Sequence, residues 1–215
     1  MQIELKNLLP IPLKEQFLQR HSDVWGKDLK LSTGDYIKCK APSGSGKSTL
    51  VHILYKLRKD YEGDVFWDHE NVKNIDAQKL AGFRQQTFSI VFQDLRLFPH
   101  LSAFENIQLN RVLQKPFYEE SNIYEMADRL GVRSILSQAA GICSYGEQQR
   151  IAIIRALIQP FSWLIMDEPF SHLDQQNISK ASSLIREECI KRSAGFILTD
   201  LEDDQHFNYS KKLDL

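Results

Sequence analysis

The fold of this 215-residue chain is decided by Ala41-Pro42-Ser43-Gly44-Ser45-Gly46-Lys47-Ser48-Thr49. The stretch follows residues 36–40, whose side chains alternate as in a strand, and precedes residues 50–55, which contain no helix breaker. A strand, a glycine-rich turn ending in Gly-Lys-Ser and a helix form the context of a phosphate-binding loop. Ala41 departs from that pattern, because such a loop usually begins with glycine. The alternative is a chance glycine-serine turn before a helix, and residues farther along the chain argue against it.

The residue types of this loop indicate its chemistry. Gly44 and Gly46 allow the backbone to turn its N–H groups inward, and the N-terminus of the following helix adds positive partial charge. Lys47 is predicted to reach the β- and γ-phosphates of a nucleotide, and the Ser48 hydroxyl is predicted to bind Mg²⁺. The predicted nucleotide-binding residues of the loop are Ser43, Gly44, Ser45, Gly46, Lys47, Ser48 and Thr49.

Length and composition limit the class of protein. A chain of 215 residues can form one good core with a smaller subdomain, but not two full-sized domains. Its 27 basic and 28 acidic residues nearly cancel, so we expect no nucleic acid partner and no attraction to an anionic membrane. Cys39, Cys143 and Cys189 lack metal-ligand spacing and are expected to be reduced thiols. Because neither a signal peptide nor a membrane-spanning apolar run is found, we expect a soluble intracellular protein.

The rest of the sequence predicts alternating strands and helices. Pro10 and Pro12 interrupt the opening segment, and Val24, Leu29 and Leu31 are typical of strand residues that lead to a turn. Strands are predicted at 64–68, after a turn at 62–63, and at 88–92, 163–166 and 196–198. Helices are predicted at 76–84, from about 151 until Pro160, and at about 176–191, with a helical insert at 101–140 that Pro116 divides.

Three of the predicted strands run directly into polar residues, namely Gln93, the pair Asp167-Glu168 and the pair Thr199-Asp200. In open α/β sheets ligands bind at the carboxyl ends of the strands, so these side chains and the phosphate loop are expected to meet at one edge. Asp167 is suited to bind Mg²⁺, Glu168 to act as general base, and Gln93 to position metal and water. A solvated turn is the alternative for the adjacent carboxylates, but such a turn rarely closes four apolar residues. The predicted catalytic residues are Glu168, Lys47 and Gln93, and the predicted metal ligands are Ser48, Gln93 and Asp167.

A nucleobase could stack on one of three aromatic side chains near the N-terminus, Phe17, His21 or Trp25. Packing in the core is the alternative for each of them. Phe17 is the residue that we select as the predicted base-stacking side chain.

Five segments, taken together, resemble the ATP-binding cassette (ABC) ATPases. They are the phosphate loop, Phe92-Gln93-Asp94, residues 143–150 (Cys-Ser-Tyr-Gly-Glu-Gln-Gln-Arg), residues 164–169 (Leu-Ile-Met-Asp-Glu-Pro) and Ser171-His172-Leu173-Asp174. A Gly-Lys-Ser loop alone is common to many NTPases, whereas its combination with a signature-like turn that opens a Gln-Gln-Arg helix is specific. The resemblance extends from about Leu29 to Asp200, and short cassettes that serve lipoprotein release or macrolide export look most similar.

The resemblance implies an α/β fold, that of a P-loop NTPase with a RecA-like parallel-sheet core, a small antiparallel β part and a helical subdomain. It implies that residues 1–215 form a single ATP-binding cassette domain, with the helical subdomain at about 95–145.

The resemblance also implies a mechanism that uses ATP and Mg²⁺. Two cassettes, identical or different, would enclose two ATP molecules head to tail, and each site would receive Ser144 and Gly146 from the other chain. ATP would close the dimer, hydrolysis would reopen it, and the Gln93 loop would pass the motion to a transmembrane permease subunit. The implied location is cytoplasmic, at the inner face of the cell membrane through that partner.

Two parts of the sequence depart from the family pattern. The family signature is usually Leu-Ser-Gly-Gly-Gln, and this chain places Tyr145 and Glu147 within it. The family usually places a histidine that contacts the γ-phosphate where this chain has Asp200. A carboxylate about 4 Å from a phosphate charge costs about 4 kcal/mol at an effective dielectric constant near 20, so Asp200 is expected to point away, to be protonated or to lie on a shifted strand end. His206 would need a rearranged loop to substitute. We therefore predict that ATP binding is intact and that hydrolysis is slow.

Other functions remain as alternatives. A cassette ATPase that acts mechanically on envelope or cell-division machinery would have the same motifs, and a module that binds ATP with weak hydrolysis would explain the two departures. A small-molecule kinase would leave residues 143–150 and Glu168 unexplained. A chromosome-maintenance head domain is disfavoured because the heptad repeats of its long coiled coil are missing.

Overall fold

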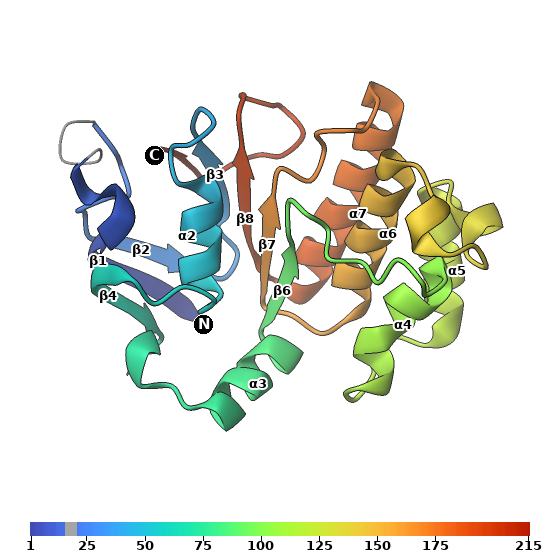
Figure 1. The fold of residues 1–215 in the computed structure, drawn as a ribbon, viewed down its shortest axis with the longest axis horizontal. Coiled ribbons are helices and arrows are strands. Elements are labelled where there is room, and N and C mark those ends of the chain that lie inside the picture. Colours follow the sequence, from blue (N-terminus) through green and yellow to red (C-terminus); the bar gives the residue numbers. More distant parts are fainter. Residues whose placement is uncertain (16–20) are drawn as a thin grey trace.

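A five-stranded parallel sheet forms the centre of the fold in the computed structural model, which describes residues 1–15 and 21–215 (Figure 1). The strand order is β6-β7-β8-β3-β9. The strands are β3 (Tyr36–Lys40), β6 (Phe88–Val91), β7 (Trp163–Asp167), β8 (Gly195–Asp200) and β9 (Lys211–Asp214). Because each neighbouring pair is parallel, all of these strands end at the same edge, which is the upper edge in Figure 1.

The apolar sequence of β7 explains why this sheet is covered on both faces. All five residues of β7 are buried. Trp163 and Ile165 pack in one hydrophobic core, and Leu164 and Met166 pack in another, because successive side chains point to opposite faces. A strand that is apolar at every position is therefore sandwiched between two layers.

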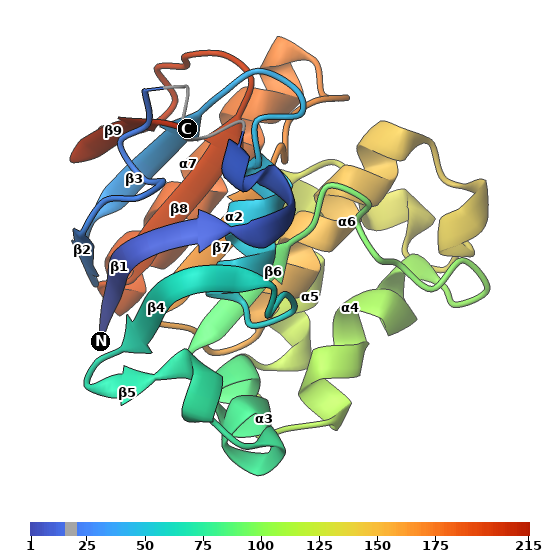
Figure 2. The ribbon, with the colours of Figure 1, turned by 60° about the vertical axis from the view of Figure 1, so that its left-hand side comes forward.

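A four-stranded antiparallel sheet forms one of these layers, together with α2 (Lys47–Leu54). Its strands are β1 (Gln2–Pro10), β2 (Leu29–Ser32), β4 (Tyr61–Trp67) and β5 (Glu70–Asn71), in the order β2-β1-β4-β5. Figure 2 brings β1 and β4 of this sheet to the front. The apolar residues of α2 share one hydrophobic core with both sheets, and the helix contacts β7 and β8 of the central sheet, so the phosphate loop that precedes it lies at the end of these strands.

The helices of the other layer are α6 (Tyr145–Ile158) and α7 (Gln175–Arg192), and they lie on the opposite side of the central sheet from α2 (Figure 1). Helices α4 (Ala103–Val112) and α5 (Glu120–Arg129) pack on the outer side of α6. Helix α3 (Ala77–Gln86) precedes β6, and short 3-10 turns lie at Ile11–Leu13, Val72–Asn74, Arg133–Ile135 and Ala140–Ile142. Among the described residues, no helix is both long and apolar enough to cross a membrane.

Local capping explains where several helices begin and end. Ser102 and Glu105 form a capping box at the start of α4, and the Asp76 carboxylate accepts a hydrogen bond from the Lys79 N–H at the start of α3. Gly131 follows the end of α5 with a φ of 66°, a left-handed conformation that favours glycine.

The predicted α/β class is confirmed, and most predicted elements lie within a few residues of the observed ones. The predicted turn at 62–63 is wrong, because Glu62 and Gly63 lie inside β4. There Gly63 adopts a φ of 76°, and an added Cβ would lie 2.2 Å from the Asn7 carbonyl oxygen. This close approach marks a bulge in β1, which shifts the register with β4 between Lys6 and Leu9.

Three features of the N- and C-terminal segments were missed or misassigned. Strand β1 was missed because its bulge at Asn7, with a φ of 48°, breaks the alternation of buried residues. Val24 was interpreted as a strand residue, but it is buried in an irregular segment outside β2. Strand β9 was missed because three of its four residues are charged, and it is held by main-chain pairing with β3.

Candidate functional site

The phosphate loop connects the end of β3 to the start of α2. Gly46 is the N-cap of α2 with a φ of 95°, and Gly44 has a φ of 78°. Both values lie in the region that residues with a side chain rarely adopt, so these two glycines allow the loop its shape. The loop borders a cavity of about 190 Å³. The lining residues are Ser43, Gly44, Gly46, Lys47, Ser48, Thr49, Gln93 and Glu168.

Lys47 is held inside this cavity by its own loop and by a carboxylate. Its Nζ donates to the main-chain oxygens of Ala41 (2.7 Å) and Pro42 (3.1 Å), and it lies 3.3 Å from Glu168 Oε1. The ammonium group of Lys47 is thus held within the cavity that the phosphate loop borders. An incoming phosphate would replace Glu168 as its anionic partner.

Glu168 and Gln93 meet at the ends of neighbouring strands. Gln93 Nε2 donates to Glu168 Oε2 (3.1 Å), and the Ser48 hydroxyl donates to Gln93 Oε1 (3.4 Å). Glu168 has a φ of 48°, and its N–H donates to the Thr199 carbonyl (3.0 Å). A strained backbone at this position turns the carboxylate out of the strand toward the cavity, and such strain is typical of functional sites.

Asp167, the last residue of β7, is almost fully buried and accepts a hydrogen bond from the Thr199 hydroxyl (2.5 Å). It borders a second cavity of about 200 Å³, which Ser48 and Gln93 also line. A hydroxyl, a carboxamide oxygen and a carboxylate are hard oxygen donors, which suit Mg²⁺. In the described part of the chain, no cluster of three or more histidine, cysteine or acidic residues could hold a metal. Ser48, Gln93 and Asp167 supply three such oxygens, fewer than the six that Mg²⁺ takes, so phosphate oxygens and water would fill the other positions.

Arg155 on α6 fixes the loop that follows Gln93. Its guanidinium donates to the main-chain oxygens of Leu95 (2.5 Å) and Arg96 (2.8 Å), which have φ values of 57° and 48°. Burial lowers the pKa of Arg155 to about 10, so it stays charged at neutral pH. Neither this contact nor that of Thr199 with Asp167 was predicted, because both join residues far apart in the sequence.

The turn at 143–147 begins α6. Ser144 is the N-cap and shares a capping box with Glu147, and an added Cβ on Gly146 would lie 2.9 Å from the His172 carbonyl oxygen. Ser144 and Gly146 do not line the phosphate-loop cavity that the described residues form. Tyr145 is different, because its hydroxyl donates to the Gln93 carbonyl of the same chain (2.9 Å).

Asp200 is paired with a lysine. Its Oδ2 lies 3.3 Å from Lys38 Nζ, and the Lys38 side chain is only 1% exposed. Lys38 also contacts Asp204, which accepts a hydrogen bond from the Tyr209 hydroxyl. The expectations for Asp200 were a carboxylate that points away, that is protonated or that lies on a shifted strand end, and none of them included this pairing with Lys38. A lysine in the middle of a central strand was the sequence signal for this pair.

The aromatic candidates for base stacking have different outcomes. Phe17 lies outside the described residues. Trp25 is buried in the core beside the antiparallel sheet, so it does not face a ligand, and His21 is exposed.

The loop, the strand ends and the turn before α6 occur together in one known family. The sequence profile of the family described as "ABC transporter" matches residues 26–171, more than half of the chain. The chain belongs to the ABC transporter family. The resemblance inferred from its motifs is confirmed.

Two curated relatives illustrate the similarity of this ABC transporter family member to known cassettes. The lipoprotein-releasing system ATP-binding protein LolD of Syntrophotalea carbinolica is 36% identical over 68% of this chain and 66% of its own length. The macrolide export ATP-binding/permease protein MacB of Bdellovibrio bacteriovorus is 32% identical over 71% of this chain and 23% of its own length. The chain thus spans less than two thirds of the length of either relative.

The fold of this family member is also that of a solved cassette. The dimeric, post-hydrolysis structure of the ATP-binding cassette MJ0796, bound to ADP and Pi, superposes with a TM-score of 0.79 over 94% of this chain and 88% of that one. The sequence identity is 24%, so this likeness concerns the fold.

Proposed function

We propose that this chain is the Mg²⁺-dependent, ATP-hydrolysing subunit of an ABC transporter. The observation that supports this most is the convergence of the phosphate loop with Gln93, Asp167 and Glu168 at one edge of a parallel sheet. Family membership and the bound ADP and Pi of the MJ0796 cassette favour a nucleoside triphosphate as the substrate. Residues 1–215 would act as one cassette domain, with the helices at about 95–145 as its helical subdomain.

In this proposal the loop binds the triphosphate of ATP. Residues 43–49 supply N–H groups and the positive end of α2, and the ammonium of Lys47 neutralises the β- and γ-phosphates. Ser48, Gln93 and Asp167 would hold Mg²⁺, which would neutralise charge that develops on the phosphate oxygens.

Glu168 is proposed as the general base. Its carboxylate would take a proton from a water molecule while that water attacks the γ-phosphorus and the bond to the leaving ADP oxygen breaks. Gln93 lies 3.1 Å from Glu168, so its carboxamide is placed to orient this water. Charge neutralisation by the loop and a positioned base are the two contributions required of the protein.

A second cassette, identical or different, is proposed as a partner. Ser144 and Gly146 stand at the start of α6, outside the cavity of their own chain, so they are available to another copy's nucleotide. The dimeric MJ0796 structure supports a pair of cassettes.

A transmembrane permease subunit is the second proposed partner, and it would place the chain at the cytoplasmic face of the membrane. A groove of about 460 Å³ opens beside the Gln93 loop, where Phe92 and Arg96 line it together with the exposed side chains of Phe98 and Leu113. The groove therefore offers apolar and cationic contacts next to Gln93, whose side chain contacts the carboxylate of Glu168. Isolation from membranes with identification of the attached protein tests this partner, and attachment to envelope or division machinery without a permease would contradict it.

We further propose that hydrolysis is slow. Lys38 balances the charge of Asp200, so repulsion of the γ-phosphate is reduced, but this position still supplies a carboxylate and no hydrogen-bond donor. Comparison of phosphate release with that of LolD under the same conditions tests the rate. Equal turnover numbers would contradict the proposal.

The Glu168→Gln variant tests the hydrolytic function itself. It keeps the shape of the side chain but removes the base, so we expect unchanged ATP binding and a fall in turnover of about 100-fold or more. Glu187→Gln is the matched control, because Glu187 is paired with Arg129 on the surface away from the site and should be neutral. Normal phosphate release by Glu168→Gln would remove Glu168 from the role of base.

A further inference from the structure

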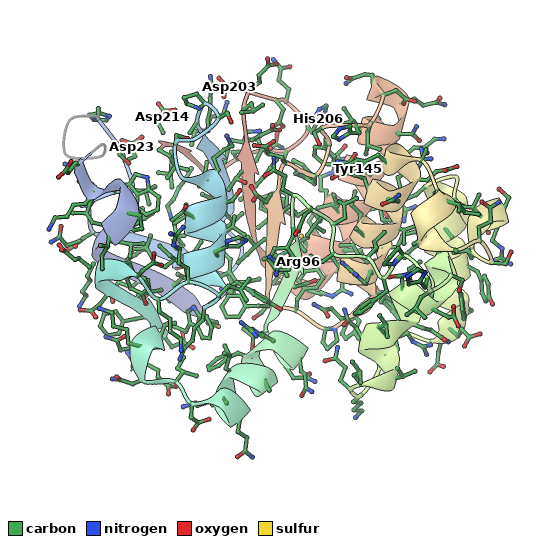
Figure 3. All side chains as sticks on the ribbon, viewed as in Figure 1. Asp23, Arg96, Tyr145, Asp203, His206 and Asp214 are labelled. Carbon is green, nitrogen blue, oxygen red and sulfur yellow. The ribbon has the colours of Figure 1, made fainter. Side chains whose placement is uncertain are left out.

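Tyr145 connects the start of α6 to the catalytic edge of the sheet within a single chain. Its hydroxyl donates to the Gln93 carbonyl at 2.9 Å, and its ring lies 4.2 Å from the His172 ring with the planes tilted by 54°. Figure 3 labels Tyr145 at the N-terminal end of α6, on the side of the sheet's carboxyl edge. One side chain thus contacts the loops that follow both β6 and β7.

The residue that Tyr145 holds is directly connected to the proposed base. The Gln93 carboxamide donates to Glu168 at 3.1 Å and accepts from Ser48 at 3.4 Å. Gln93 is therefore held at two points, by the phenol of Tyr145 at its main-chain carbonyl and by the carboxylate of Glu168 at its side-chain amide.

A second set of contacts gives α6 a fixed place next to these loops. Buried Gln149, one turn farther along α6, donates to the Ser171 hydroxyl (3.0 Å) and accepts from the His172 N–H (3.1 Å). Because Gln149 anchors this face of the helix, Tyr145 cannot follow the Gln93 loop freely. Movement of that loop away from Glu168 must stretch or break the bond to Tyr145.

We propose that Tyr145 is a positioning residue that holds Gln93 against Glu168, and that this contact must open in each turnover and so slows hydrolysis. The inference deepens the proposed function and rests on it. Both carboxylate oxygens of Glu168 are engaged in this arrangement, Oε2 by Gln93 Nε2 and Oε1 by Lys47, so Gln93 must shift before Oε2 can accept a proton from water. The hydrogen bond from Tyr145 stabilises the state in which Gln93 contacts Glu168. It therefore raises the free-energy barrier to hydrolysis.

The Tyr145→Phe variant removes the donor and keeps the ring beside His172. Tyr124→Phe is the control, because Tyr124 stacks on Phe104 at 5.4 Å and its hydroxyl makes no hydrogen bond to the residues that the structure describes. One neutral hydrogen bond changes an equilibrium by about 2–10-fold. We expect kcat of Tyr145→Phe to rise about 3-fold or more, with the KM for MgATP changed less than about 2-fold and the control unchanged. An unchanged or lower kcat would overturn the proposal.

Hydrogen exchange of the nucleotide-free protein separates this inference from the proposed hydrolysis. The N–H groups of Leu95 and Arg96 donate within the Gln93 loop, to Phe92 and Asp94. They should exchange faster in Tyr145→Phe than in the parent or the Tyr124→Phe control. Equal exchange rates in Tyr145→Phe and the parent would show that Tyr145 does not hold the Gln93 loop, even if ATP is hydrolysed. Faster exchange without phosphate release from either protein would instead refute the hydrolytic function and the kinetic part of the inference with it.

Discussion

Replacement of Lys38 by methionine would remove the charge that balances two carboxylates beside the phosphate loop. Lys38 Nζ lies 3.3 Å from Asp200 and 2.5 Å from Asp204, and the three side chains are 1%, 27% and 10% exposed, respectively. Methionine preserves the length and apolar stem of lysine. The change therefore isolates the ammonium group.

The size of the effect follows from burial. Removal of one partner from a buried ion pair costs about 3–5 kcal/mol, because the remaining charge is left without compensation. Asp200 is partly exposed and can be rehydrated, whereas Asp204 has little access to water. We therefore expect Lys38→Met to lower the free energy of unfolding by about 3 kcal/mol at pH 7, a large part of the 5–15 kcal/mol typical of a domain.

The loss of stability should depend on pH in a defined direction. Burial alone would raise the pKa of the Asp204 carboxyl, but hydrogen bonds from Lys38 and Tyr209 and the charge of Lys38 outweigh it, so the pKa lies below its usual value. A carboxyl with a lowered folded-state pKa stabilises the fold above its unfolded pKa of about 3.9, and this is lost as the pH falls through the folded value. Without Lys38 burial dominates and the pKa rises, so that protonation relieves the unpaired charge. The difference between parent and variant should therefore narrow as the pH falls from 7 toward about 4.

Urea denaturation at several pH values, with a common slope for the parent and the variants, measures this effect. Lys40→Met is the control, because Lys40 pairs with Asp203 on the surface, where solvent screening leaves an ion pair with little effect on stability. The double variant Lys38→Met/Asp204→Asn should regain part of the lost stability. The reasoning is refuted if Lys38→Met costs no more than Lys40→Met, or if its cost does not change with pH.

Two further substitutions test the phosphate loop and the central sheet. Lys47→Ala should weaken binding of a fluorescent ATP analogue at least about 10-fold, because a hydrogen bond to a charged group contributes about 1.5–3 kcal/mol. The far-ultraviolet circular dichroism should stay the same. Equal affinity would exclude Lys47 from phosphate binding. Gly195→Ala should lower the free energy of unfolding, measured by urea denaturation, by about 3 kcal/mol, because the new Cβ would lie 2.4 Å from the buried Trp163 ring. An unchanged free energy of unfolding would show that the ring can move aside.

Local sequence accounted for the parts of this fold that depend on neighbouring residues. Residues 41–49 predicted the turn from β3 into α2, and observed φ values of 78° and 95° at Gly44 and Gly46 agree with the need for glycine there. Four apolar residues before Asp167 predicted a buried strand, and the rule that parallel strands end at one edge predicted that Asp167, Glu168 and Gln93 would meet.

Contacts between distant residues determined the rest. The bulge that hid β1 exists because Gly63 approaches Asn7, and β9 forms because its main chain pairs with β3. From the sequence, Asp200 was predicted to be an unbalanced negative charge at the position next to the γ-phosphate. Only the tertiary structure showed that Lys38, 162 residues earlier in the chain, balances this charge. Spacing and backbone sterics are local properties that a sequence displays directly. The energy of a buried charge or a phenol depends on which groups the completed fold brings within hydrogen-bond distance.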